Sequence, residues 1–218
     1  MIKAAVYACG DLLNPELYDR VYKLISPQRR EHVDSAKNLK NRCQRLGASH
    51  LLEKLLWENH IERPYVFSET EQGKPILLEP EGIYFSLSHS DLFAAAVISD
   101  RPCGIDIERI REYKPALVKR FFTRYDQEYL AQEQEEYKNR AFTEMWTFKE
   151  ATCKMLDRPL VQVLQWIDYS PYSDCSKGDI SWYRCGYEFR DFYITICQQT
   201  DAVKVPVKLF SPAEGRYY

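Results

Sequence analysis

The chain has 218 residues, enough for one large domain or two of about 100 residues each. Its formal net charge of −2 argues against a general nucleic-acid binder. Hydrophobic residues make up 45% and charged residues 28% of the chain, the composition of an ordinary globular protein. The seven cysteines form no Cys-x-x-Cys pair, so we expect reduced core residues of a cytoplasmic protein, not disulfides or zinc ligands. No apolar run reaches the length of a signal peptide or a membrane span.

The first half of the chain is expected to mix strands and helices. Asn14 and Ser26 are suitable N-caps, each followed by a proline at the first helical position. Residues 2–9, 65–68, 83–87 and 92–99 have the pattern of strands, and residues 15–25 and 42–57 that of helices. The segment between these helices is strongly basic, which fits either a solvated helix face or an anion-binding surface. Its basic residues are Arg29, Arg30, His32, Lys37, Lys40, Arg42 and Arg45.

The second half begins with an apolar strand at 103–110. A basic stretch at 111–119 follows, expected to be partly irregular because Pro115 interrupts it. A helix should start at Thr123, continue through the charged residues 128–138 and lead into a helix at 142–156. Strands are expected at 161–169, 179–188, 192–198 and 203–210, before a short tail. Both halves of the chain are therefore expected to mix strands and helices.

Two acids lie on the strand at 103–110, and a third lies on the following helix. Residues alternate sides along a strand, so Asp106 and Glu108 should share one face, about 7 Å apart along the backbone. Glu150 borders the apolar stripe of its helix, and Lys154 lies one turn further on the same side. Each piece alone is most often structural. Converging carboxylates and a lysine, however, suit a hard cation and a phosphate, so together they predict a Mg²⁺ and phosphate site.

Five motifs occur in a fixed order along the chain. They are Gly73-Lys74-Pro75, Phe85-Ser86-Leu87-Ser88-His89-Ser90, Gly104-Ile105-Asp106-Ile107-Glu108, Arg120-Phe121-Phe122 and Trp146-x-x-Lys149-Glu150-Ala151-x-x-Lys154. The set closely resembles the Sfp-type 4′-phosphopantetheinyl transferases, whose pattern combines a GKP turn, an F-N-x-S-H-S hairpin, a G-x-D-x-E strand and a W-x-x-K-E-x-x-x-K helix. Ser86 departs from the usual asparagine. The order and spacing match over residues 73–154.

This resemblance implies a fold and an activity. The fold would be α+β, with two similar α/β halves related by a pseudo-twofold at residues 1–101 and 102–210. Residues 211–218 would form a tail, and coenzyme A would lie in the cleft between the halves. The activity would be transfer of the 4′-phosphopantetheine group of coenzyme A to a serine of an apo acyl or peptidyl carrier protein, releasing adenosine 3′,5′-bisphosphate. The resemblance also implies a Mg²⁺ requirement and a monomer.

The resemblance also implies roles for particular residues. Asp106, Glu108 and Glu150 match the Mg²⁺ ligands, and Lys154 matches a contact to the α-phosphate. The predicted catalytic residues are therefore Glu150, Lys154 and Glu108, with Glu150 the first candidate for the base that accepts the serine proton and Glu108 the second. The predicted coenzyme A-binding residues are Arg29, His32, Arg42, Arg45, Gly73, Lys74, Pro75, Ser88, His89, Asp106 and Lys154. His32 stands where the family usually has lysine, and either Arg42 or Arg45 fills the place of the family's helix arginine.

The stretch 111–124 combines cations with Phe121 and Phe122. It is a candidate docking lip for the carrier protein, or the two phenylalanines anchor the next helix in the core. Two other functions stay open: a non-catalytic binder of coenzyme A or carrier protein on the same fold, and an unrelated Mg²⁺-dependent phosphohydrolase.

Overall fold

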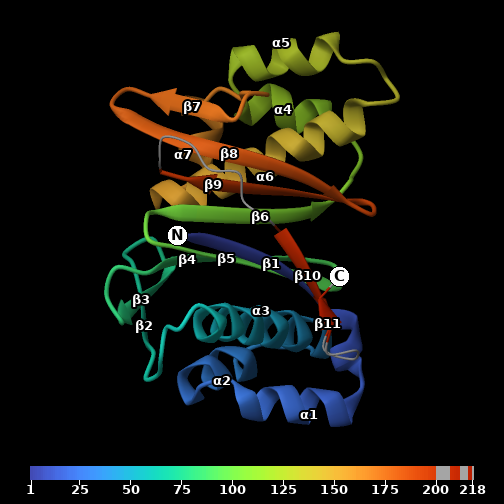
Figure 1. The fold of residues 1–218 in the computed structure, drawn as a ribbon. Coiled ribbons are helices and arrows are strands. Elements are labelled where there is room, and N and C mark those ends of the chain that lie inside the picture. The colour runs from blue at the N-terminus through green and yellow to red at the C-terminus, as the bar shows by residue number, and fades with distance from the viewer. Residues whose placement is uncertain (200–206, 212–215, 218) are drawn as a thin grey trace. The chain divides into compact units, whose positions relative to one another are not determined.

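The computed structural model describes residues 1–199, 207–211 and 216–217 (Figure 1). Its helices and strands make a mixed α+β protein, as the sequence predicted. The chain forms two compact units. The first contains residues 1–100 together with the last two described strands, and the second starts at Arg101. Among the helices of the described residues, none has the length and hydropathy needed to cross a lipid bilayer.

The first unit is a five-stranded sheet with helices packed on it and a separate two-stranded hairpin. The sheet order is β11-β10-β1-β5-β4, and β2 pairs with β3. The elements of this unit are β1 (Ile2–Ala8), the 3-10 turn η1 (Cys9–Leu13), α1 (Pro15–Leu24), α2 (Pro27–Asp34), α3 (Leu39–Glu58), β2 (Val66–Glu69), β3 (Pro75–Glu79), β4 (Tyr84–Ser90), β5 (Phe93–Ser99), β10 (Val207–Ser211) and β11 (Arg216–Tyr217).

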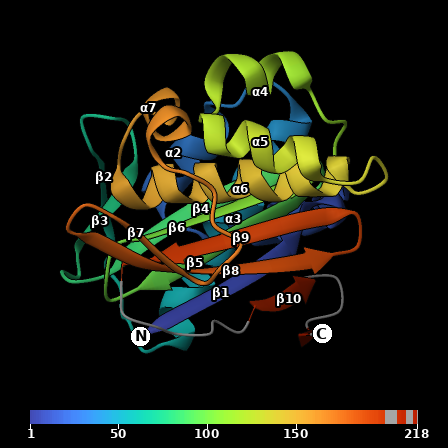
Figure 2. The same ribbon diagram turned by 90° about the horizontal axis from the view of Figure 1, so that it is seen from above.

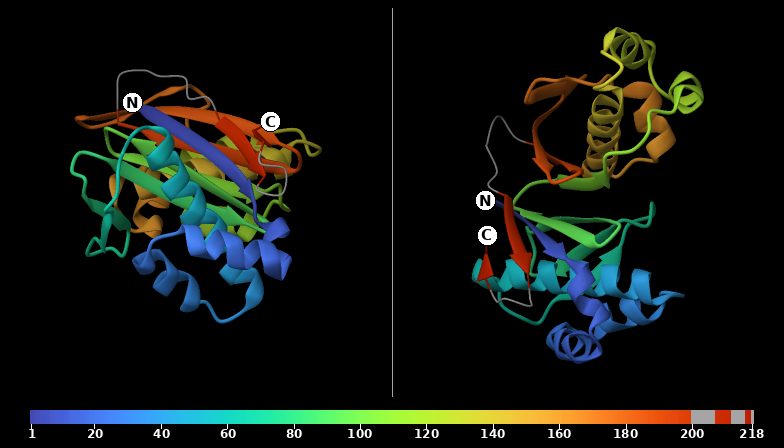
Figure 3. Two further views of the ribbon diagram at one scale, coloured as in Figure 1. Left: turned by 60° about the horizontal axis from the view of Figure 1, so that its bottom comes forward. Right: turned by 90° about the vertical axis from the view of Figure 1, so that its right-hand side faces the viewer.

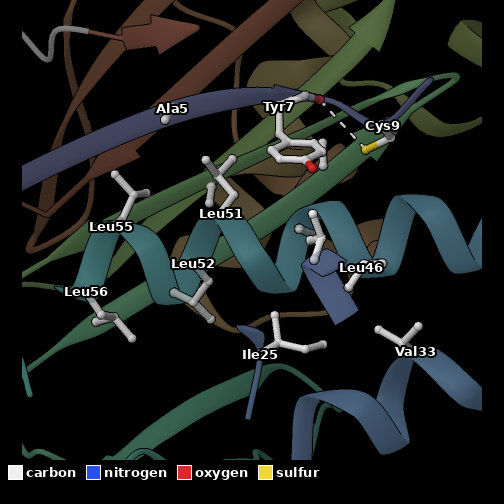
Figure 4. Close-up of a cluster of buried hydrophobic side chains, with 14 of the residues drawn as sticks. Ala5, Tyr7, Cys9, Ile25, Val33, Leu46, Leu51, Leu52, Leu55 and Leu56 are labelled. Carbon is white, nitrogen blue, oxygen red and sulfur yellow. Dashed lines mark hydrogen bonds between the residues drawn. The ribbon is translucent and has the colours of Figure 1, made fainter. Parts of the chain in front are cut away.

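The helix α3 supplies the core of this unit. Leu51, Leu52 and Leu55 are buried, and Figure 4 shows Leu51 directed toward Tyr7 of β1. Local signals set where the helices begin: the side chain of Asn14 accepts a hydrogen bond from the backbone N–H of Leu17 and so caps α1. Burial of these leucines, each contributing about 1.5–3 kcal/mol, stabilises α3 in the core, with Leu52 on the side of the helix away from Tyr7 (Figure 4).

The second unit is a four-stranded antiparallel sheet, β6-β9-β8-β7, covered by helices. Figure 2 shows the long helix α6 running along this sheet, with α4, α5 and α7 beside it. The elements of this unit are β6 (Cys103–Arg109), α4 (Pro115–Phe121), α5 (Arg124–Gln132), α6 (Lys138–Leu156), α7 (Leu160–Trp166), β7 (Asp174–Lys177), β8 (Ile180–Phe189) and β9 (Phe192–Gln198).

Several sequence predictions about this unit were wrong. Residues 160–166 form the helix α7 instead of a strand, because Val163 and Leu164 bury one helical face against the core. The stretch 111–119 is partly irregular, as predicted, since residues 111–114 have no regular structure. Pro115, however, starts α4 and does not interrupt a helix, because proline fits the first helical position. The expected continuous helix from Thr123 breaks at residues 133–137, between α5 and α6. In the first unit, the hairpin strand β3 was not predicted either.

The end of the chain also differs from the sequence prediction, which placed residues 102–210 in the second half and made 211–218 a tail. The strand β10 pairs in parallel with β1, with Val207 opposite Ala4 and Phe210 opposite Tyr7. Figure 3 shows β10 beside β1, and β11 pairs with β10 in turn. This late segment belongs to the first unit because the ladder on the open edge of β1 satisfies its backbone hydrogen-bonding groups. The predicted strand residues 203–206 lie outside the described residues.

Candidate active site

A glycine sets the distance between the two elements that carry the acids. A Cβ added to Gly104 of β6 would lie 1.9 Å from the carbonyl oxygen of Ala151 and 2.7 Å from the backbone nitrogen of Met155. Both of these atoms belong to α6, so the helix backbone packs directly on the strand at this point. Because side chains alternate along the strand, Asp106 and Glu108 point the same way as the missing Cβ, toward α6.

Asp106 and Lys154 form the best-defined pair on this face. Asp106 is 3% exposed, and the Nζ of Lys154 lies 2.7 Å from its Oδ1 and 3.1 Å from the carbonyl oxygen of Ile105. The pKa of Lys154 is raised overall. Burial lowers this pKa, but the negative charges of Asp106 and Glu150 raise it by more. The lysine is therefore a fixed cation, held one turn beyond Glu150 on α6 as the spacing predicted.

Glu150 titrates near neutral pH. Its pKa is raised to about 7, first by burial and then by the charges of Asp106 and Glu108, against the opposing effect of Lys154 and Arg111. These five charges therefore lie within electrostatic reach of one another. We call Asp106, Glu108, Glu150 and Lys154 the acid–lysine group. A carboxyl with a pKa near 7 is suited to accept a proton at physiological pH.

The donor set of the acid–lysine group suits a hard cation, because three carboxylates supply oxygen ligands. Within the described residues, however, no three His, Cys, Asp or Glu side chains already lie together as a closed metal-binding group. One reason is visible at Asp106, whose Oδ1 is held by the Lys154 ammonium. The carboxylates therefore suit Mg²⁺ by the chemistry of their oxygen donors, and the charges of Asp106 and Glu108 act on Glu150.

A second group of charges gathers in the first unit. The pKa of His32 is lowered to about 4, first by desolvation and then by the charges of Arg29, Arg45 and His89. We call these four residues the basic cluster. Arg29 is 5% exposed and donates to the hydroxyl of Ser49 at 3.1 Å. Burial lowers the pKa of Arg29 to about 10, with Arg45 acting in the same direction.

The structure separates the two helix arginines that the sequence left as alternatives. Arg45 donates to the carbonyl of His32 at 2.9 Å and to the hydroxyl of Ser35 at 2.6 Å. Arg42 instead donates to the carbonyl of Ala36 at 3.2 Å. Arg45, and not Arg42, is thereby brought to the basic cluster.

The remaining predicted coenzyme A-binding residues lie on β4 and at the β2–β3 turn. Ser88 is 8% exposed, whereas His89 is exposed at the end of β4. Gly73 has φ +79°, a conformation that favours glycine, and its N–H donates to the carbonyl of Thr70 at 2.9 Å. Lys74 follows directly and lines a cavity of about 330 Å³ within the first unit. Pro75 begins β3.

One motif residue has a structural role that the sequence did not reveal. Lys149 precedes Glu150, yet its side chain is 0% exposed and its Nζ lies 2.5 Å from Oδ2 of Asp126. The same ammonium donates to the carbonyl of Ile167, and Oδ1 of Asp126 accepts from the backbone N–H of Tyr169 at 2.7 Å. Lys149 therefore ties α6 to α5 and to the start of the 167–173 segment. The only sequence signal was the capping box that Asp126 makes with Thr123.

The candidate docking lip at residues 111–124 contains both buried and exposed side chains. Phe122 is 5% exposed and packs near Phe142 and Trp146, so it anchors the core, as the alternative reading held. Apart from Arg111, the cations of this stretch remain on the surface. Those exposed are Lys114, Lys119, Arg120 and Arg124.

Fold and site together describe an α+β protein with carboxylates and a lysine on one strand–helix face and a basic cluster in the other unit. Such groups are suited to bind a phosphorylated ligand together with a hard cation. Residues 102–197 match the model of the 4′-phosphopantetheinyl transferase superfamily. This segment is therefore similar to that superfamily, and the five motifs of the chain resemble those of its Sfp-type members.

Curated relatives show the same similarity. The chain is 29% identical over 148 residues to the 4′-phosphopantetheinyl transferase gsp of Aneurinibacillus migulanus, covering 66% of this chain and 62% of that protein. It is 27% identical over 154 residues to the 4′-phosphopantetheinyl transferase Sfp of Bacillus subtilis, covering 65% and 64%. It is 39% identical over 94 residues to the 4′-phosphopantetheinyl transferase HetI of a Nostoc strain, covering 40% of each. The matched part thus spans less than two thirds of the length of these relatives.

Proposed function

We propose that this chain transfers the 4′-phosphopantetheine group of coenzyme A to a serine of an apo acyl or peptidyl carrier protein. The main support is the acid–lysine group, which combines three carboxylates with a fixed lysine on a segment that matches the transferase superfamily. Mg²⁺, when bound by Asp106, Glu108 and Glu150, would neutralise charge on the pyrophosphate of coenzyme A. The family's pseudo-twofold relation between the halves, a monomeric state and a cytoplasmic location belong to the same proposal.

The proposed chemistry is a displacement at phosphorus. The serine oxygen of the carrier protein bonds to the β-phosphorus of coenzyme A. The bond from that phosphorus to the oxygen shared with the α-phosphate breaks, and adenosine 3′,5′-bisphosphate leaves with the bond's electron pair. Lys154 would bind the α-phosphate and stabilise the charge that develops on it. Glu150 would accept the serine proton, for which its pKa of about 7 is well matched.

The basic cluster would bind the nucleotide end of coenzyme A. The pKa of His32 is lowered first by burial and then by the charges of the other three members. An anionic phosphate would relieve the repulsion among these charges. Arg29 is already fixed by its bond to Ser49 and by the ring of Phe67, 5.5 Å from its guanidinium carbon. The predicted Gly73, Lys74, Pro75 and Ser88 belong to the same proposed binding site, and Arg42 is assigned a flanking role.

One assay separates this function from its alternatives. Purified protein is incubated with coenzyme A, Mg²⁺ and an apo carrier protein, and the carrier is analysed by intact mass spectrometry while free phosphate is measured. We expect the carrier to gain one phosphopantetheine, with an equal amount of adenosine 3′,5′-bisphosphate released. Free phosphate without a mass gain would indicate a phosphohydrolase. Coenzyme A binding without either product would indicate a non-catalytic binder.

A further inference from the structure

The connection between β6 and α4 is tied along the first turns of α6. The backbone N–H of Arg111 donates to the hydroxyl of Thr143 at 3.1 Å, and that of Tyr113 donates to Oδ1 of Asn139 at 2.9 Å. Thr143 and Asn139 are four residues apart and share one face of α6. The backbone that carries Arg111 is therefore fixed on the helix that carries Glu150.

The Arg111 side chain is held between aromatic rings and an acid. Its guanidinium carbon lies 4.6 Å from the ring centre of Trp146 and 5.8 Å from that of Phe142. Its Nε and Nη2 are buried and have no hydrogen-bond partner among the described residues. Its Nη1 lies 3.9 Å from Oε1 of Glu108. The planar group thus packs on the indole and presents one edge to the carboxylate.

We propose that Arg111 is a positioning residue for Glu108, with Trp146 as the platform that fixes the guanidinium. This rests on the proposed function, in which Glu108 ligates Mg²⁺. A separation of 3.9 Å is too long for a hydrogen bond, so the arginine acts on the orientation of Glu108 through its charge. The tryptophan of the Trp146-x-x-Lys149-Glu150 motif then acts on the acid–lysine group through Arg111.

Two features of the arrangement call for arginine and tryptophan in particular. Only a planar guanidinium can stack on a ring and keep an N–H edge toward an acid, whereas a lysine ammonium is a point charge on a flexible stem. Tryptophan is also the strongest cation–π partner among the aromatic side chains. Arg111→Lys therefore keeps the charge and removes the stacking, and Trp146→Leu keeps Arg111 and removes its platform.

Mn²⁺ titration followed by electron paramagnetic resonance tests the proposal, with saturating coenzyme A and no carrier protein. Mn²⁺ is a suitable probe because it takes the same oxygen ligands as Mg²⁺. We expect Arg111→Lys and Trp146→Leu each to weaken Mn²⁺ binding about 10-fold, the size typical of residues that orient a metal ligand. The double variant should be no weaker than either single variant, because both changes disable one device. Circular dichroism checks that each variant is folded.

Arg109→Lys is the matched control. Arg109 lies two residues from Arg111 but pairs with Asp191 at 2.6 Å, so its conservative replacement should leave Mn²⁺ affinity unchanged. Wild-type affinity in Arg111→Lys would overturn the proposal, as would additive losses in the double variant. Glu108→Gln separates the two levels of inference. If it binds Mn²⁺ as well as wild type, or if wild type binds none, the metal role of Glu108 fails and the positioning role fails with it.

Discussion

Replacing Gly104 with alanine should disrupt the site without touching any charged residue. The added Cβ would lie 1.9 Å from the carbonyl oxygen of Ala151, roughly 1.5 Å short of ordinary van der Waals contact. The obstructing atoms are backbone atoms of α6, so no side-chain rotation relieves the clash. Overpacking usually costs about 1–3 kcal/mol, and we expect this change to reach the upper end of that range because a whole helix must move.

The same movement should impair transfer. A shift of α6 by about 1.5 Å would take Lys154 out of hydrogen-bonding range of Asp106, where the separation is now 2.7 Å. A misplacement of about 1 Å in an active site can cost roughly 10²-fold in rate. We therefore expect Gly104→Ala to lose about 10²-fold in kcat while it remains folded at low temperature.

The assay combines urea unfolding with transfer kinetics on the folded protein. Gly10→Ala is the control, because a Cβ at Gly10 would make only an ordinary 3.5 Å contact with Leu92 and no left-handed backbone is involved. It should be near wild type in both measurements. Wild-type stability and kcat in Gly104→Ala would refute the close packing of α6 on β6 and the account of the site built on it.

Three further predictions concern the buried Lys149–Asp126 ion pair, the histidine His50 and the basic cluster. Lys149→Met should cost about 3–5 kcal/mol in the free energy of unfolding, because it leaves Asp126 charged and buried. The double variant with Asp126→Asn should recover much of this stability. If the single and double variants lose the same amount, the pairing is contradicted. The pKa of His50 is lowered to about 4, first by burial. The protein should therefore have its full stability above pH 6.5 and lose up to about 3 kcal/mol in the free energy of unfolding as the pH falls toward 4 and the ring must be protonated. In His50→Gln this part of the pH dependence of unfolding should vanish, and an unchanged pH profile would contradict the lowered pKa. We place His89 near the 3′-phosphate of coenzyme A, so His89→Ala should weaken coenzyme A binding about 10-fold or more, as expected for the loss of a charge-assisted hydrogen bond. Binding of dephospho-coenzyme A, which lacks that phosphate, should stay nearly unchanged in calorimetry, and equal losses for the two ligands would contradict this placement.

The parts of the site that follow local periodicity could be predicted from sequence. Strand alternation put Asp106 and Glu108 on one face, and helical spacing put Lys154 one turn beyond Glu150. Both relations involve neighbours two or four residues apart. The pairing of Lys149 with Asp126 spans 23 positions, and no local pattern could reveal it.

The errors in the fold have the same origin. The segment Leu160–Trp166 is apolar enough to fit either a strand or a helix, and only burial of Val163 and Leu164 in the second unit selects the helix. The pairing of β10 with β1 joins residues about 200 positions apart in the chain. Such a contact depends on which sheet edge is open in the folded unit, which sequence periodicity does not encode.

The most direct test of the proposed function is the single-turnover rate of phosphopantetheine transfer by Glu150→Gln, measured by intact mass of the carrier protein at saturating Mg²⁺ and coenzyme A. The substitution keeps the side-chain volume and removes the charge and the proton acceptor that α6 holds beside Asp106 and Lys154. Its unfolding curve should match that of wild type or lie slightly above it, because a buried carboxyl is relieved of its charge. We expect Glu150→Gln to transfer phosphopantetheine at least about 10²-fold more slowly than wild type. Transfer at the wild-type rate in a folded Glu150→Gln protein would contradict it.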